Sequence, residues 1–188
     1  MRYAASLVLA GAMMLSGCSE DQPTAKPLND KHLELQSREK DSYPHYYGAV
    51  DIKQADKALP FKVILPKKYP FKGSAEKSVI TDWGKKKKLS VETGILPSDQ
   101  GLPFYMAMYT FNHENKVSQM IKDKQYSETA ELDDGTEAYI TVNDSYISIG
   151  WKDGEFEHLL EYAASSGALP KSAKKDALKA ASSAMDDK

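Results

Sequence analysis

Apolar and polar residues alternate along the second half of the chain in a pattern that predicts antiparallel β-strands. Such alternation places one side of each strand in the core and the other in solvent. Asp133-Asp134-Gly135 and Asn143-Asp144-Ser145 interrupt the pattern with residues that tight turns favour. The buried sides of the resulting meander would be defined by Ile140 with Val142 and by Ile147, Ile149 and Trp151. Its three predicted strands are 126–132, 136–142 and 146–151.

A longer apolar run over 104–111 predicts the central strand of the sheet. Its sequence, Phe-Tyr-Met-Ala-Met-Tyr-Thr-Phe, is apolar at both alternating sets of positions, which is typical of a strand covered on each side. Residues 89–93 alternate and predict a half-buried strand. Two shorter apolar runs predict strands over 61–65 and 79–83, and the Gly- and Pro-containing segment 95–103 predicts a loop.

The segment 155–164 fits two periodicities, and we predict a strand at its start. Alternate residues from Phe156 are apolar or aromatic, but apolar residues also recur there at helical spacing. The strand is favoured because the preceding Asp-Gly turn continues the meander.

The end of the chain has the pattern of an amphipathic helix. Ser172 is a residue type that favours the N-cap position. Small and apolar residues recur beyond it on one side of the predicted helix, a stripe that would lie on the sheet: Ala173, Ala177, Leu178, Ala181 and Met185. Shorter helical pieces are predicted over 29–38, 51–59 and 117–121.

These elements together predict an α+β fold, with a single antiparallel twisted sheet and the C-terminal helix packed on it. The globular domain is expected over 45–188. Residues 18–44 are rich in polar residues and proline, and few apolar side chains interrupt them. Such a segment buries too little apolar surface to offset the entropy of ordering, so it is predicted to be a flexible tether.

The first 17 residues have the pattern of a signal peptide. Arg2 precedes the uncharged apolar run Ala4–Leu15, which is too short to span a bilayer. The run ends in Leu15-Ser16-Gly17-Cys18, which resembles the lipobox of bacterial lipoproteins. That resemblance implies cleavage before Cys18, diacylglycerol on its thiol, and a location at the cell membrane facing outside the cytoplasm. Cys18 is the only cysteine in the chain, so it has no disulfide partner within the chain.

Charge is distributed in two blocks of opposite sign. The net charge of -2 gives no indication of a nucleic-acid partner. Residues 60–90 contain nine lysines and two acidic residues, whereas residues 123–161 contain eleven acidic residues and two lysines. The blocks could form a basic face directed toward an anionic surface. We favour the alternative that the two halves lie side by side and neutralise each other.

A run of lysines is the first candidate ligand-binding segment: Lys85, Lys86, Lys87 and Lys88. It lies at a predicted hairpin turn. The run could dock the domain on an anionic polymer or membrane, or it could be a solvated turn.

Aromatic residues at the start of the domain are the second candidate: Tyr43, His45, Tyr46 and Tyr47. These side chains could form a stacking platform for a sugar or another flat ligand. The alternative, which we favour, is that they attach the start of the domain to its core.

The sequence contains no pattern that specifies catalysis. Acylation of Cys18 would leave no thiol nucleophile, and the four histidines lack the spacing of a metal-ligand pair. His113-Glu114 is best explained as a surface turn pair. The aspartates fall at turns without EF-hand spacing, and no glycine-rich phosphate loop is present. We therefore predict no cofactor, no metal site and no enzymatic activity.

The C-terminal part resembles an uncharacterised β-rich domain of Gram-positive extracytoplasmic lipoproteins and membrane-bound regulators. The resemblance is carried by Asp-Gly-Thr-Glu-Ala-Tyr, by Ile-Ser-Ile-Gly-Trp-Lys-Asp-Gly-Glu-Phe and by the final Ser-Ala-Lys-Lys helix, over 132–185. It departs at 161–169, where this chain has additional residues. It implies a fold and a location, but no reaction.

The expected function is therefore that of a lipid-anchored, non-catalytic envelope module for binding, sensing or scaffolding. Its expected partners are the membrane, through the lipid on Cys18, and an envelope protein or anionic polymer. The alternative is a carrier or chaperone that holds an apolar ligand between sheet and helix.

Overall fold

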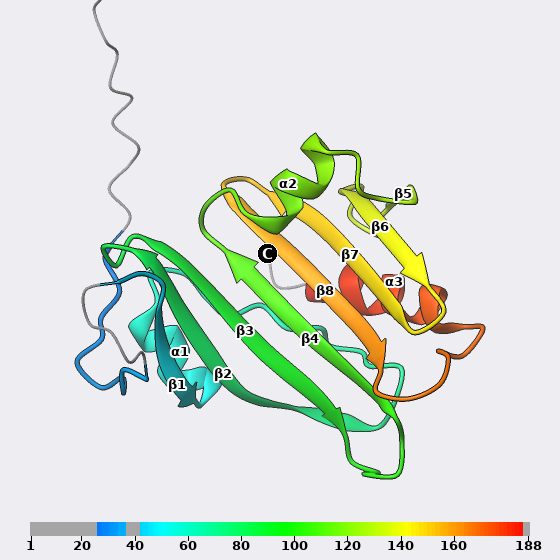
Figure 1. The fold of residues 1–188 in the computed structure, drawn as a ribbon, viewed down its shortest axis with the longest axis horizontal. Helices are drawn as coiled ribbons and strands as arrows, with labels where there is room; N and C mark the ends of the chain where they lie inside the picture. The colour runs from blue at the N-terminus through cyan, green and yellow to red at the C-terminus, as the bar shows by residue number, and fades with distance from the viewer. Residues whose placement is uncertain (1–25, 37–41, 186–188) are drawn as a thin grey trace, which may run out of the picture.

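The computed structural model describes residues 26–36 and 42–185, which form one eight-stranded antiparallel sheet with three helices (Figure 1). The strands are β1 (His45–Val50), β2 (Gly73–Gly84), β3 (Lys88–Pro97), β4 (Phe104–Phe111), β5 (Glu128–Glu131), β6 (Glu137–Asn143), β7 (Tyr146–Asp153) and β8 (Phe156–Ala164). The helices are α1 (Ile52–Ala58), α2 (Lys116–Lys122) and α3 (Ala173–Ala184). The predicted α+β class is confirmed.

The sheet consists of two four-stranded meanders that meet in its middle. The strand order is β1-β2-β3-β4-β8-β7-β6-β5, so β4 pairs with the last strand and not with the next one along the chain. After β4 the chain crosses to the far edge through α2 and returns strand by strand. The predictions of a central strand over 104–111 and of a strand within 155–164 are both confirmed.

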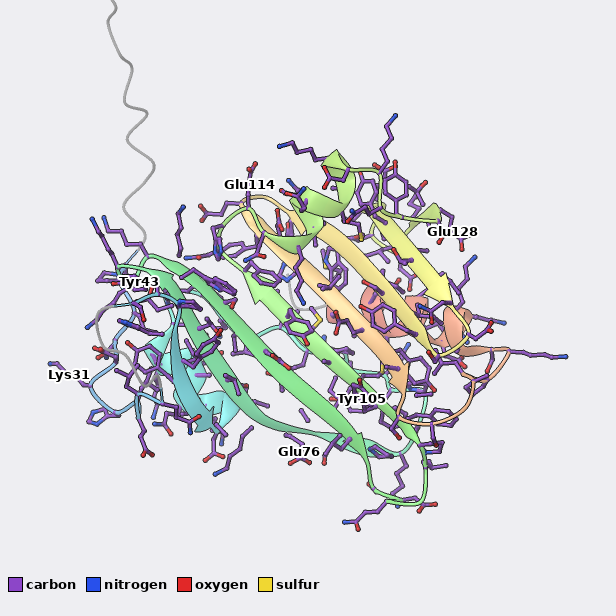
Figure 2. All side chains as sticks on the ribbon, in the orientation of Figure 1. Lys31, Tyr43, Glu76, Tyr105, Glu114 and Glu128 are labelled. Carbon is purple, nitrogen blue, oxygen red and sulfur yellow. The ribbon has the colours of Figure 1, made fainter. Side chains whose placement is uncertain are left out.

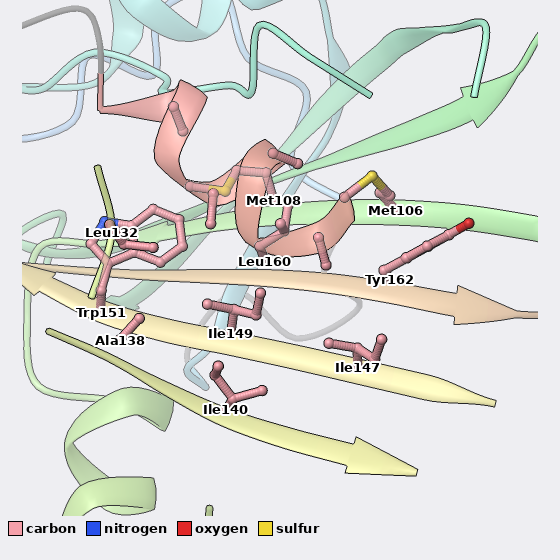
Figure 3. Packing of buried hydrophobic residues seen from close by; sticks show 14 of the residues in the cluster. Met106, Met108, Leu132, Ala138, Ile140, Ile147, Ile149, Trp151, Leu160 and Tyr162 are labelled. Atoms are coloured by element: carbon pink, nitrogen blue, oxygen red, sulfur yellow. The ribbon is translucent and has the colours of Figure 1, made fainter. Parts of the chain in front are cut away.

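One face of the sheet, which we call the covered face, carries α1 and α3 (Figure 1). Ile147, Ile149 and Trp151 of β7 lie on this face, and each is at most 2% exposed. Figure 3 shows them beneath α3 with side chains of β4, β6 and β8. The predicted alanine stripe of α3 is buried against them, so the helix lies close to the strands.

Residues 26–36 pack against the first meander. Leu28 is buried with Ile80 and Leu89 in a second apolar cluster beside α1. The N–H of Gln36 donates to the carbonyl of Tyr46 at 2.8 Å, so this segment runs beside β1. The prediction of a flexible tether is therefore wrong for residues 26–36, because apolar side chains without a periodic pattern still find a core. The predicted signal peptide and Cys18 lie outside the described residues.

Two local predictions also fail, and a third is met in position alone. Residues 29–36 contain no helix: residues 31–32 form a turn, and Leu35 forms a β-bridge with Tyr47 of β1. Residues 61–65 are not a strand: they cross the covered face without a partner strand, and their apolar side chains pack on both clusters. Ser172 takes the N-cap position of α3, as predicted, but its side chain makes no capping bond and its carbonyl accepts from the N–H of Asp176.

Candidate functional site

The opposite face of the sheet is only partly covered, and we call it the open face. Alternate residues of β4 point to opposite sides. Met106 and Met108 are in the core, whereas Tyr105 is 40% exposed. Figure 2 shows Tyr105 on this side of β4, which is the side across which α2 lies. Only the part of the open face around α2 is covered by a helix (Figure 1).

Small residues occupy adjacent strands at the centre of the open face, and we call this row, with the side chains that border it, the hollow. The register places Gly94 of β3 opposite Ala107 of β4, and Ala107 opposite Glu161 of β8. A Cβ built on Gly94 would meet nothing within 4 Å. Tyrosines stand on both sides of this row: Tyr105 and Tyr146 on one side, and Tyr109 on the other.

Two tyrosine–carboxylate pairs border the hollow. The hydroxyl of Tyr146 donates to Glu161 Oε1 at 2.8 Å, and that of Tyr109 donates to Glu92 Oε1 at 3.2 Å. Lys116 of α2 lies 3.8 Å from Glu161 and 4.8 Å from the ring centre of Tyr109. The hollow therefore combines ring faces, carboxylate acceptors and one cation, drawn from α2 and from four strands.

The environment keeps the two paired tyrosines protonated. Burial, together with the charges of Glu161 and Glu92, raises the pKa of Tyr109 above its ordinary value. Burial also raises the pKa of Tyr146, and the charge of Glu161 adds to this effect. At neutral pH both hydroxyls are hydrogen-bond donors and neither is a base or a nucleophile.

A buried carboxylate holds α2 on the open face. Glu157 of β8 is 2% exposed and accepts the backbone N–H groups of Asn115, Val117 and Ser118 at 3.0–3.1 Å. The Ser118 hydroxyl also donates to it. These N–H groups at the start of a helix have no partner within it, so Glu157 satisfies them from outside.

A glycine in β7 lets α2 approach the sheet closely. A Cβ on Gly150 would lie 3.0 Å from Val117 Cγ2 and 3.1 Å from Met120 Cε. Val117 is completely buried between Phe111 and Leu159. Along this helix runs a groove of about 1020 Å³, which extends to residues of β2, β7 and β8 and includes Trp83, Tyr146 and Glu161 in its lining.

The predicted lysines lie where expected: Lys85, Lys86 and Lys87 form the turn between β2 and β3, and Lys88 begins β3. The buried carboxylate of Asp82 shapes this turn by accepting the N–H groups of Gly84 and Lys86 at 2.8–3.0 Å. Lys85 and Lys86 have positive φ angles of 52° and 60°, as a tight hairpin requires. Lys86 pairs with Asp30 at 2.8 Å, and its hydrogen bond lowers the pKa of that carboxyl. The exposed side chains of the run are Lys85, Lys86, Lys87 and Lys88.

The predicted aromatic platform is divided between two sides of β1. Tyr47 is 4% exposed in the core, so its assignment to a ligand platform is wrong and the core interpretation holds for it. Its neighbour Tyr46 points the other way and is 45% exposed. Tyr43 stacks on His45 with ring centres 4.4 Å apart, and Tyr43 itself is exposed. Alternation along a strand explains why the set separates.

The two charge blocks are separated within the sheet but approach each other at α3. In the sheet, the uncharged β4 lies between the lysines of β2, β3 and their turn and the strands that carry the acidic residues. Segment 61–72 holds the other four lysines of the basic block, and its Lys67 donates a backbone N–H to Ser183 of α3, next to Ser182, which accepts the N–H of Asp133. Glu161 and Glu128 pair with Lys116 and Lys174, which lie outside the basic block. That the two blocks lie side by side and neutralise each other stays a prediction.

Sequence reasoning missed the hollow, although part of its signal was present. Tyr105 and Tyr109 have the same parity in β4, opposite to that of the core methionines. Their partners Glu92, Glu161 and Tyr146 come from three other strands, and only the sheet order brings these together.

Three searches of the described part of the chain and of known proteins gave negative results. Within residues 26–36 and 42–185, no cluster of three potential metal ligands occurs. The same residues include no helix of the length and apolar character that a membrane span requires. Comparison of the chain with protein-family models, with curated proteins and with solved structures found no match.

Proposed function

We propose that this protein is a lipid-anchored envelope lipoprotein whose domain is a non-catalytic binding module, and that the open face is its binding surface. The observation that carries the proposal is the hollow, where exposed and half-buried tyrosines and two carboxylates surround the small residues Gly94 and Ala107. On the covered face, α1 and α3 bury the apolar side chains of the strands.

The chemistry of the hollow favours a ligand that presents hydroxyl or amino groups beside a flat apolar surface. Glu92 and Glu161 supply acceptor oxygens, and the tyrosine rings supply faces for stacking. Because Tyr109 and Tyr146 remain protonated, their hydroxyls act as hydrogen-bond donors in this site.

Close packing of α3 favours this binding role over the carrier alternative. A carrier of the predicted kind needs space between sheet and helix. Ala177, Ala180 and Ala181 of α3 are at most 1% exposed and pack in the same cluster as Ile149 and Leu160. Small side chains here bring the helix onto the strands, which leaves that space filled.

The lipid anchor is tested at Cys18. Mass spectrometry of the mature protein should find diacylglycerol on residue 18, and Cys18→Ala should leave the precursor uncleaved at this position. Mature protein without lipid on residue 18 would contradict the anchor. The diacyl form matters because a single acyl chain binds membranes only reversibly.

The binding surface is tested by photo-crosslinking in the cells that make the protein. A photoreactive residue at Tyr105 should give a discrete product that Glu161→Gln reduces. The matched control position is Val142, which is similarly exposed at 38% but lies on β6, away from the hollow. Equal products from both positions, or a product from Tyr105 that is insensitive to Glu161→Gln, would contradict the assignment of the open face.

A further inference from the structure

The chain enters the described part of the fold beside the lysine turn. The N–H of Leu28 donates to the carbonyl of Lys86 at 2.9 Å, and Asp30 forms an ion pair with the Lys86 ammonium. The described chain therefore begins, at residue 26, next to the β2–β3 turn at one end of the sheet (Figure 1). The described chain thus starts, on the side of Cys18, next to the lysine turn.

Lys26 follows Cys18 by only eight positions, with seven residues between them. Eight such steps span at most about 29 Å when fully extended, and the root-mean-square reach of a flexible coil of this length is about 15 Å. A lipid on Cys18 therefore holds the lysine turn close to the membrane surface.

The side chains at this end form what we call the basic corner: Lys85, Lys87, Lys88, Trp83 and Tyr43. Trp83 and Tyr43 are 40% and 46% exposed. Among the described residues, Lys86 is the member of the lysine run that forms an ion pair, so the ammonium groups of the other three are available to an outside anion. Figure 2 shows Tyr43 at this end of the molecule.

This composition matches the surface of an anionic bilayer. Lysines are attracted to negatively charged headgroups, and tryptophan and tyrosine favour the boundary between headgroups and acyl chains. Acidic side chains at the same end of the sheet, Glu114 and Glu155, lie in the turns after β4 and β7. The attraction is therefore restricted to the corner from which the tether leaves.

We propose that the basic corner docks on the anionic headgroups of the membrane that holds the lipid of Cys18. The proposal rests on the lipid anchor of the proposed function and adds a second, electrostatic contact to it. The anchor makes this contact intramolecular, so weak individual attractions are sufficient. Docking would direct the sheet away from the bilayer. Tyr105 lies six residues along β4 from Phe111, which would place the hollow up to about 20 Å farther from the membrane.

Fluorescence of the full-length lipidated protein in vesicles tests this proposal, because the chain contains only two tryptophans. Trp83 is exposed at the corner, whereas Trp151 is completely buried. Phosphatidylglycerol with bromine on its acyl chains near the headgroup should quench Trp83 in anionic vesicles. A Trp83→Phe variant supplies the background from Trp151. High salt should reduce the quenching, because salt screens the lysines.

The decisive variant replaces Lys85, Lys87 and Lys88 with Gln and retains Lys86 for its pair with Asp30. Each lysine near an anionic surface strengthens binding roughly fivefold, so the triple change should weaken docking by about 100-fold and abolish the quenching of Trp83. The matched control changes Lys171, Lys175 and Lys179 to Gln, which removes equal charge at exposed sites in and before α3. That control should be quenched like the wild type, and melting temperatures should confirm that both variants fold.

Two measurements separate failure of docking from failure of the anchor. Flotation with vesicles reports the anchor: a wild-type protein that does not float would overturn both proposals. A protein that floats but shows no quenching, or equal quenching in neutral and anionic vesicles or in both triple variants, would overturn docking alone. Lysine-dependent sedimentation with wall fragments, without quenching of Trp83, would assign the corner to a wall polymer and also overturn membrane docking.

Discussion

The two faces of the sheet use the same strands for different purposes. On β4, Met106 and Met108 point to the covered face and are at most 2% exposed, while Tyr105 points to the open face and is 40% exposed. On β7, Trp151 fills the core, whereas Gly150 makes room for α2. The covered face is thus packed to exclude water, and the open face is arranged around hydrogen-bonded polar pairs and small residues.

The difference teaches that stability and binding can be assigned to opposite sides of one strand. Burial of apolar side chains supplies the main driving force for folding, and the covered face carries most of it. The open face contains hydrogen-bonded tyrosines whose removal exposes no large cavity. Substitutions on the two faces should therefore separate the two properties.

The largest expected effect is at Trp151 on the covered face. Trp151→Ala should lower the free energy of unfolding by about 3–5 kcal/mol, because it leaves a cavity beneath α3. Tyr105→Ala on the open face should change it by less than about 1 kcal/mol, since exposed positions contribute little. Urea denaturation measures both. Equal losses would mean that the open face also carries the stability of the domain.

A smaller loss is expected from Glu157→Gln, which tests how α2 is held. The amide keeps one acceptor oxygen but loses the charge that three backbone N–H groups and Ser118 contact, so about 2 kcal/mol should be lost. Hydrogen exchange should rise in α2 before it rises in β7. The exposed Glu92→Gln serves as control, with an expected change within about 0.5 kcal/mol. A stable Glu157→Gln protein with a protected α2 would contradict this role.

Two glycines on the open face sharpen the comparison within that face. Gly150→Val should cost about 1–3 kcal/mol, because its side chain overlaps Val117 and Met120 of α2. Gly94→Val meets nothing within 4 Å and should be neutral or slightly stabilising, because β-branched residues favour strands. Thermal melts of the two variants provide the measurement. If Gly94→Val also fills the hollow, crosslinking from position 105 should fall although stability is kept.

The smallest effect on stability at neutral pH is expected from the substitution Tyr47→Phe. Burial, followed by the charges of Asp30 and Asp82, raises its pKa to about 12 in the folded state, above the ordinary value of about 10. The stabilisation is present below pH 10 and is lost as the pH rises through about 12, because the unfolded chain releases the proton first. Tyr47→Phe should remove this loss of stability between about pH 10 and 12. An unchanged alkaline profile in the variant would show that Tyr47 is not its source.

The local sequence pattern was sufficient to predict structure that forms between residues close together in the sequence. The turns at 133–135 and 143–145 and the strands beside them follow from alternation and from turn-forming residues, and all of them occur in the structure. Trp151 was placed correctly in the core because alternation fixes its side of the strand once one face is buried. The lysine turn was found in the same way, because charged residues between two apolar strands favour a solvent-exposed hairpin.

Only the tertiary structure decided which strands are neighbours and what each face carries. Pairing of β4 with β8 joins residues about 50 positions apart, and no local periodicity encodes such a partner. That pairing brought the side chains of the hollow together and left α2 across the open face. Two further segments also depended on tertiary packing. Residues 26–36 have no periodic pattern but are ordered by packing, whereas the apolar run 61–65 has no partner strand. The reason is physical, since local turns cost little entropy to form, whereas distant contacts form only when the burial of a shared core offsets the cost of closing a long loop.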